Sequence, residues 1–147
     1  MTLKTQLNDA MKAAMKARDD LRLSAVRMVR AAIKNREIET RAELDDQAVT
    51  DVISTMAKQR RESIRMYREG NRLELAEKEE LELSVLLEFL PTQLSTEEID
   101  TLVSQVILDI EASGAKDMGR VMKAVTPLTA GKADGKVVSN AVRRLLA

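Results

Sequence analysis

The chain has 147 residues, and its 24 Lys and Arg are balanced by 24 Asp and Glu, so its formal net charge is zero. It contains no Cys and no His, which excludes Cys-His and Ser-His-Asp catalysis and the usual zinc sites. One Phe and one Tyr are its only aromatic residues, so stacking platforms for single-stranded nucleic acid are not expected. A carboxylate-magnesium site and a Lys or Ser nucleophile stay open.

The remaining composition is typical of an all-α protein. Hydrophobic residues make up 44% of the chain and charged residues 33%, and Ala, Leu, Glu, Lys, Arg and Met are all strong helix formers. The first 20 residues lack the apolar core of a signal peptide. No stretch approaches the roughly 20 apolar residues of a membrane span. We therefore expect a cytoplasmic protein with no membrane partner.

Apolar residues recurring every three or four positions predict four helices in the first part of the chain. Thr2 caps the first, Asp19 or Asp20 the second, and Asp45 with Asp46 opens the third. Gly70-Asn71 is expected to end the third helix in a left-handed conformation. The first helix is predicted over about 2–16, and the second begins at 19 or 20. The third is predicted over about 45–69, and the fourth over 72–90, where Pro91 ends it.

Residues 91–95 then form a predicted linker, and three short helices follow. Thr96 with Glu98 opens one that Gly114 ends, Asp117 caps a second over 118–125, and Asp134 caps the last. We therefore predict a helical N-terminal domain of long antiparallel helices over 1–92, followed by a small three-helix tail domain over 93–147.

Local charge departs strongly from the neutral total. Residues 52–72 hold six bases and two acids, and residues 74–88 hold six acids and one base. Residues 95–115 hold five acids and no base, whereas residues 116–147 hold seven bases and two acids. Such segregation marks possible binding faces that the net charge conceals.

A basic row on the third helix is one candidate surface. Its members follow spacings of 3, 4, 3 and 4, so they share one helix face opposite the apolar stripe and suit a phosphate backbone. The alternative is a solvated face neutralised by pairs such as Lys58-Glu62 and Arg65-Glu69, or by the acidic fourth segment. The row comprises Lys58, Arg61, Arg65, Arg68 and Arg72.

Arg60 projects instead into the apolar stripe, near Met56 and Ile64. Either its stem packs while its guanidinium reaches water, or it forms a buried pair with a Glu. The nearby glutamates, at positions 74, 77, 79, 80, 82 and 88, could bind magnesium loosely. A solvated or salt-bridged helix face is the interpretation that we favour.

The run 130–136, AGKADGK, places glycines and lysines at a predicted helix start. It could cradle a phosphate with backbone N–H groups, although its spacing is not that of a Walker loop. In the alternative, Asp134 takes those amides as an N-cap. A third possibility combines the cap with phosphate contacts from the side chains of Lys132, Lys136 and Arg143.

Several strings resemble the YqeY family: KARDDLRLS (16–24), AIKNREIE (32–39), KQRRESI (58–64), EKEE (77–80), FLPTQL (89–94), KDMGRVM (116–122) and GKADGKVV (131–138). They occur in family order over essentially the whole chain. This family is similar to the C-terminal helical and tail region of the B subunit of the tRNA-dependent amidotransferase, which acts on Glu-tRNA(Gln) and Asp-tRNA(Asn). In that enzyme the tail contacts tRNA, while transamidation and glutamine hydrolysis take place elsewhere.

The resemblance implies a tRNA-binding protein that acts by binding rather than by catalysis of its own. Family members are often labelled carbon-nitrogen ligases with glutamine as amide donor, a label that fits the larger enzyme. We expect no catalytic residue, cofactor or metal site. An adaptor that docks a tRNA synthetase or an amidotransferase subunit is the alternative. The candidate RNA-binding residues are Lys116, Arg120, Lys123, Lys132, Lys136, Arg143 and Arg144 in the tail, with Lys58, Arg61, Arg65 and Arg68 extending the track.

Overall fold

A computed structural model describes residues 2–147. Across these residues the chain forms seven α-helices and one short 3₁₀ turn, and it contains no strand, so the predicted all-α class is confirmed. None of the described helices is both long enough and apolar enough to cross a membrane. The helices fall into two compact units that divide between Pro91 and Thr92.

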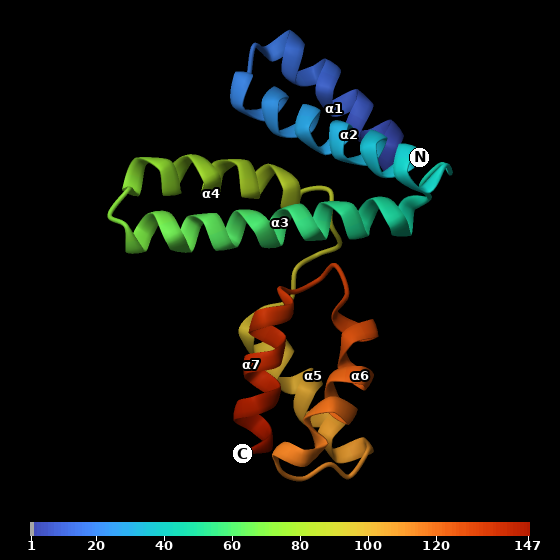
Figure 1. Cartoon of the computed structure of the whole chain (residues 1–147), viewed down its shortest axis with the longest axis vertical. Coiled ribbons are helices and arrows are strands. Elements are labelled where there is room, and N and C mark those ends of the chain that lie inside the picture. Colours follow the sequence, from blue (N-terminus) through green and yellow to red (C-terminus); the bar gives the residue numbers. More distant parts are fainter. Residues whose placement is uncertain (1) are drawn as a thin grey trace. The chain divides into compact units, whose positions relative to one another are not determined.

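The first unit consists of two helical hairpins (Figure 1). One pairs α1 (Leu3–Ala17) with α2 (Asp20–Thr40), and the other pairs α3 (Asp46–Glu69) with α4 (Leu73–Leu87). Side chains from all four helices share one core, because each hairpin buries an apolar face against the other. The fully buried members include Leu7, Val26, Val29, Val49, Ile53 and Leu86.

Polar caps fix where these helices begin. The side chains of Thr2, Asp19 and Asp45 each accept a backbone N–H from the first turn of the helix that follows, as predicted. The pair Gly70-Asn71 ends α3 with a left-handed residue, as predicted, and that residue is Asn71, with a φ of 56°, whereas Gly70 has a φ of −84°. Asn tolerates this conformation better than most residues, so the turn needs no glycine at that position.

The second unit packs three helices around a separate core that includes Val103, Val121, Val125 and Val142. These helices are α5 (Thr96–Asp109), α6 (Met118–Thr129) and α7 (Gly135–Leu146), and the 3₁₀ turn η1 (Ala115–Asp117) leads into α6. The helix α5 begins at Thr96, as predicted, and its N-cap is the preceding residue, Ser95. The Ser95 hydroxyl accepts the Glu98 N–H while the Glu98 carboxylate accepts the Ser95 N–H, which is a complete capping box.

The helix α6 runs past Pro127, although the sequence predicts that it ends at 125. Proline removes a backbone donor and usually stops a helix. Here it falls in the final turn, where the Thr126 hydroxyl donates to the Met122 carbonyl at 2.7 Å and the buried Thr129 hydroxyl donates to the Val125 carbonyl at 3.2 Å. Threonine hydroxyls thus bond to the backbone on either side of Pro127, and the helix continues to Thr129.

Candidate nucleic-acid interface

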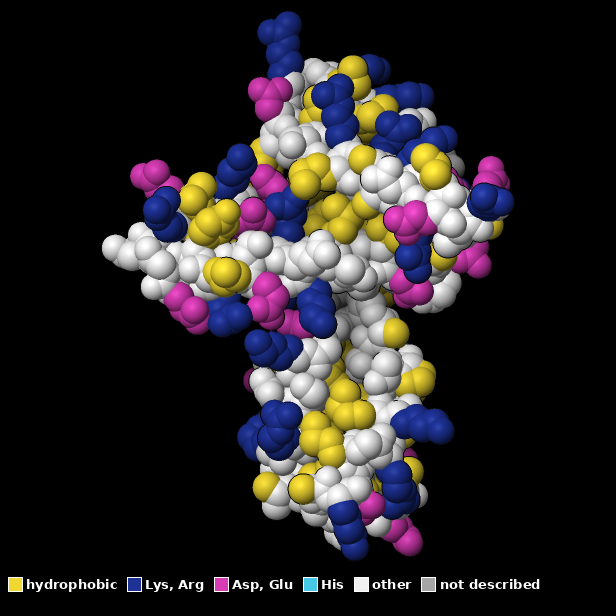
Figure 2. Space-filling view, viewed as in Figure 1, with side chains coloured by type: hydrophobic (Ala, Val, Ile, Leu, Met, Phe, Trp, Pro, Cys, Tyr) yellow, Lys and Arg dark blue, Asp and Glu magenta, His cyan; other side chains and the backbone are white. Residues whose placement is uncertain are grey.

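The seven basic side chains of the second unit are all exposed, and all lie outside α5. Lys116 is in η1, Arg120 and Lys123 lie three residues apart on one face of α6, and Lys132 is in the turn before α7. The remaining three, Lys136, Arg143 and Arg144, are on α7. On the face of this unit that Figure 2 shows, Lys and Arg side chains are more prominent than Asp and Glu side chains.

The acidic side chains of this unit are segregated from the basic ones. Five of its acids lie on or just after α5, and the two others, Asp117 and Asp134, already serve as local hydrogen-bond acceptors. The Asp117 carboxylate accepts the Ser113 N–H at 2.8 Å and pairs with Arg120 at 3.1 Å. The Ser113 hydrogen bond, aided by Arg120, lowers the pKa of Asp117. Asp117 occupies the predicted N-cap position of α6, but its side chain makes no capping hydrogen bond to that helix.

Asp134 does cap α7, since its carboxylate accepts the Lys136 N–H at 3.2 Å. The N-cap interpretation of the run 130–136 is therefore confirmed. The turn is also fixed from outside, because the Gln93 side chain donates to the Gly131 carbonyl at 2.8 Å and the Leu94 N–H donates to the Lys132 carbonyl at 2.8 Å. Because the Asp134 carboxylate already accepts a backbone N–H at the start of α7, a phosphate would be contacted here by side chains rather than by backbone amides.

The basic side chains of the tail differ in how far they are neutralised. Arg120 pairs with Asp117, and Arg144 pairs with Asp100 of α5 at 2.6 Å. Arg143 hydrogen-bonds only the neutral Asn140, at 3.1 Å. Three further side chains form no ion pair within residues 2–147, namely those of Lys116, Lys123 and Lys132. Four cations of the tail thus form no ion pair in the part of the chain that the structure describes, and one of them, Lys116, lies near enough to Asp117 to help lower its pKa.

The basic row of α3 is more strongly neutralised. Arg65 pairs with Glu62 at 2.8 Å and with Glu69 at 3.1 Å, and these hydrogen bonds and charges raise its pKa. Arg68 pairs with Glu80 of α4. Lys58 and the half-buried Arg61 form no ion pair among the described residues. The predicted Arg65-Glu69 pair and the neutralisation by the acidic fourth segment are both present, whereas the predicted Lys58-Glu62 pair is not formed. Lys58, Arg61 and Arg72 are the members of the row without an ion pair among the described residues.

Arg60 forms a buried ion pair, one of the two alternatives drawn from the sequence. Its side chain is 10% exposed, and it pairs with Glu79 at 2.6 Å and with the equally buried Glu82. Glu88 pairs with Arg22 of α2. Glu79, Glu80 and Glu82 of α4, and Glu88 just after it, therefore join this part of the chain to other helices. Among the described residues, no group of three or more His, Cys, Asp or Glu side chains is placed to hold a metal ion.

Together, fold and charge define an all-helical protein of two units, whose second unit carries most of its acids on or just after α5 and its bases on the elements that follow. The chain belongs to the Yqey-like protein family, whose sequence model matches residues 4–146. The resemblance seen in the sequence motifs is thus confirmed.

Two curated relatives illustrate the similarity. "Altered inheritance of mitochondria protein 41, mitochondrial" of Lachancea thermotolerans is 37% identical over 111 residues, which cover 73% of this chain and 59% of the relative. The protein of the same name from Eremothecium gossypii is 32% identical over 145 residues, covering 96% of this chain and 79% of the relative. The chain spans about three fifths of the length of several such relatives.

These relatives overturn the expectation of a cytoplasmic protein, because their names place them in mitochondria. The expectation rested on the missing signal-peptide core and on the missing membrane-length apolar segment. Neither feature separates the cytoplasm from the interior of an organelle, since proteins of both compartments fold in water.

Proposed function

We propose that the protein binds RNA, with tRNA as its ligand, through the exposed basic side chains of the second unit. The observation that carries this proposal is the set of four tail cations that form no ion pair among the described residues. Lys116, Lys123, Lys132 and Arg143 sit on elements whose two acids are already engaged. Unneutralised Lys and Arg side chains are the groups that contact a phosphate backbone.

The resemblance to the amidotransferase B subunit supports tRNA as the ligand. In that enzyme the region similar to this chain contacts tRNA, and the amide-transfer chemistry lies in other parts. The present chain has neither Cys nor His, so its proposed role is to bind tRNA rather than to transform it. Turnover of misacylated tRNA by the purified chain with ATP and glutamine would contradict this role.

Charge reversal in the tail tests the site. The double variant Lys132→Glu with Lys136→Glu changes the charge by the same amount as Lys12→Glu with Lys16→Glu, and both pairs are exposed and four residues apart. We expect the tail variant to abolish tRNA binding in a filter-binding or electrophoretic assay. The α1 variant should bind like the wild-type chain. Equal loss in both variants, or no loss in either, would contradict a tail-centred interface.

A protein-docking role is the second candidate, and apolar side chains exposed at the end of the α3–α4 hairpin favour it. Met66 is 64% exposed and Leu73 is 57% exposed, and they lie on either side of the turn that joins the two helices. We infer that a synthetase or an amidotransferase subunit is the partner class. A pull-down that still recovers such a partner after nuclease treatment supports the docking role. If the partner is no longer recovered after nuclease treatment, the docking role is contradicted.

A further inference from the structure

The basic elements of the second unit, over residues 115–147, hold few uncharged polar side chains. Their hydroxyl side chains are those of Thr126, Thr129 and Ser139, and each donates to a backbone carbonyl of its own helix, at 2.7, 3.2 and 3.1 Å respectively. A hydroxyl carries a single hydrogen, so each of these groups has already used its donor. Base edges are read by hydrogen-bonding groups that are left free for them, and these three hydroxyls have no donor to offer.

The amide side chains of the second unit are engaged as well. Asn140 is the one amide side chain within residues 115–147, and its oxygen accepts the Arg143 guanidinium at 3.1 Å. Reading an adenine takes the oxygen and the nitrogen of one amide together, and Arg143 already uses the oxygen. Gln93 and Gln105, the amides earlier in the unit, each donate to an acceptor within it at 2.8 Å. Across residues 92–147, all of which the structure describes, each amide side chain thus has a partner inside the chain.

Side chains that stack on unpaired bases lie in the other unit or are engaged. The two aromatic residues of the chain, Tyr67 and Phe89, both belong to the first unit. A guanidinium can also stack on a base, but Arg120 and Arg144 pair with carboxylates and Arg143 binds an asparagine. The other basic side chains of the tail are lysines, whose ammonium group is a compact point charge without a planar face. The second unit therefore presents mainly point charges to RNA.

We infer that the second unit binds the phosphate backbone of base-paired RNA without regard to base sequence, a substrate class that rests on the function proposed above. Phosphate contacts position a protein on a nucleic acid but carry no sequence information. Base pairing hides the base faces on which a single-strand binder depends, and it leaves the phosphates exposed. The contacts come from the four tail cations that form no ion pair among the described residues, Lys116, Lys123, Lys132 and Arg143.

A double helix favours such contacts more than a single strand does, because it holds its phosphates at higher density. Each neutralised phosphate releases about 0.9 of a counterion from a B-form duplex and about 0.7 from a single strand. Over four contacts, this difference amounts to about tenfold in affinity at about 50 mM salt. Proteins that bind single strands gain affinity by stacking bases on aromatic side chains, which this chain holds in its first unit.

Fluorescence anisotropy with the full chain tests this substrate class. The probes are tRNA, two RNA duplexes of unrelated sequence but equal length and G·C content, and one strand of the first duplex. The two duplexes should bind with affinities within about twofold of each other, and the single strand about tenfold more weakly at about 50 mM salt. A single strand that binds as tightly as its duplex, or duplexes that differ by more than about fivefold, would overturn the inference, while salt-dependent tRNA binding would leave the proposed function standing. If neither tRNA nor a duplex binds, the proposed function falls as well.

Two tail variants separate backbone contact from base readout. Lys123→Gln removes a phosphate contact, so it should weaken the binding of both duplexes by the same factor and make the salt slope shallower by about 1. Asn140→Ala removes the amide of α7 and should change the two affinities by the same factor, because that amide reads no base. A loss confined to one duplex, in either variant, would contradict backbone recognition.

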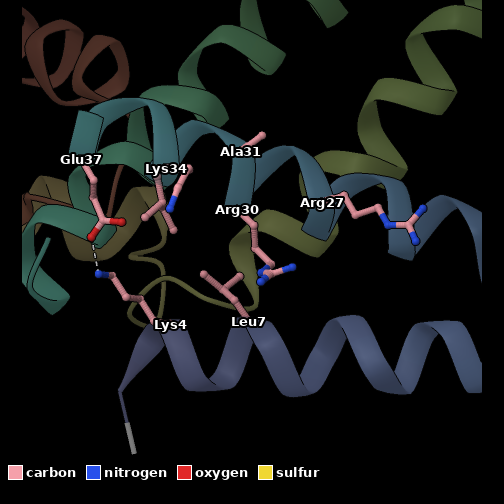
Figure 3. Close-up of a pocket in the computed structure, with 8 residues that line it drawn as sticks. Lys4, Leu7, Arg27, Arg30, Ala31, Lys34 and Glu37 are labelled. Carbon is pink, nitrogen blue, oxygen red and sulfur yellow. Dashed lines mark hydrogen bonds and ion pairs between the residues drawn. The ribbon is translucent and has the colours of Figure 1, made fainter. Parts of the chain in front are cut away.

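Lys34→Gln is the matched control for Lys123→Gln, because it removes the same charge from an exposed lysine of the first unit. Figure 3 shows Lys34 near Glu37 on α2, with Lys4 reaching the same carboxylate from α1. The Lys34 charge already acts on Glu37 and helps to lower its pKa. Lys34→Gln should bind both duplexes within about twofold of the wild-type chain, with an unchanged salt slope. An equal loss in Lys34→Gln and Lys123→Gln would show that the second unit is not the contact surface.

Discussion

Arg60 carries a full charge into the contact between α3 and α4. The carboxylates of two glutamates on α4, Glu79 and Glu82, pair with one terminal nitrogen of its guanidinium. The Met28 thioether lies 3.3 Å from the second terminal nitrogen. A buried charge is tolerated only when its partners replace the hydrogen bonds that water would make. Because Glu79 and Glu82 are three positions apart, they present both carboxylates on one face of α4 toward a single guanidinium.

Removing Arg60 should therefore destabilise the first unit strongly. Arg60→Ala leaves Glu82 buried without a partner, and we expect the free energy of unfolding to fall by about 3 kcal/mol. Arg65→Ala is the control, because Arg65 also pairs with two glutamates but is 52% exposed, so its loss should cost less than about 1 kcal/mol. Urea unfolding followed by circular dichroism measures both variants. Similar losses for the two variants would show that burial is not what makes Arg60 important.

Glu37 predicts a pH dependence of stability at the same scale. The hydrogen bond from Lys4, aided by the Leu44 N–H, lowers its pKa below the ordinary value of 4.5. A depressed folded-state pKa adds stability above the unfolded pKa, and that stability is lost as the pH falls through the folded pKa. Glu37→Gln should have a lower Tm than wild type at neutral pH.

The gap between Glu37→Gln and wild type should close as the pH falls below 4.5. Glu77→Gln, an exposed change with no ion pair in the described part of the chain, is the control and should track the wild type throughout. A Tm difference for Glu37→Gln that does not depend on pH would contradict this role of the Glu37 carboxylate.

At the scale of the helices, local side-chain chemistry sets most boundaries. The caps at Thr2, Asp19, Asp45 and Asp134 are predictable, because a short polar side chain precedes an apolar periodicity. The cap of α5 and the end of α6 are not. Ser95 and Thr96 are chemically similar neighbours, so the sequence does not show which of them caps α5. The helix α6 continues to Thr129, although a proline such as Pro127 usually ends a helix.

Ser95→Ala should cost the second unit about 1 kcal/mol, because it removes the hydroxyl half of the capping box of α5. Thr96→Ala should have a far smaller effect, since the Thr96 side chain does not cap the helix. Thermal unfolding of the two variants compares them directly. A larger loss for Thr96→Ala would place the start of α5 one residue later than the structure has it.

At the scale of the whole molecule, local charge segregation indicates binding faces that the net charge of zero conceals. The basic character of the tail is visible in the sequence, but which cations stay unpaired is not. The Arg144-Asp100 pair joins residues 44 positions apart, and the Arg68-Glu80 pair joins two different helices.

The salt dependence of tRNA binding tests the central proposal most directly. Four unneutralised tail cations that contact phosphates predict that the logarithm of the association constant falls against the logarithm of salt concentration with a slope of about −3. The slope should become shallower in Lys132→Glu with Lys136→Glu wherever binding can still be measured. Undetectable binding of tRNA at low salt, or an affinity that does not change with salt, would contradict a phosphate-binding tail.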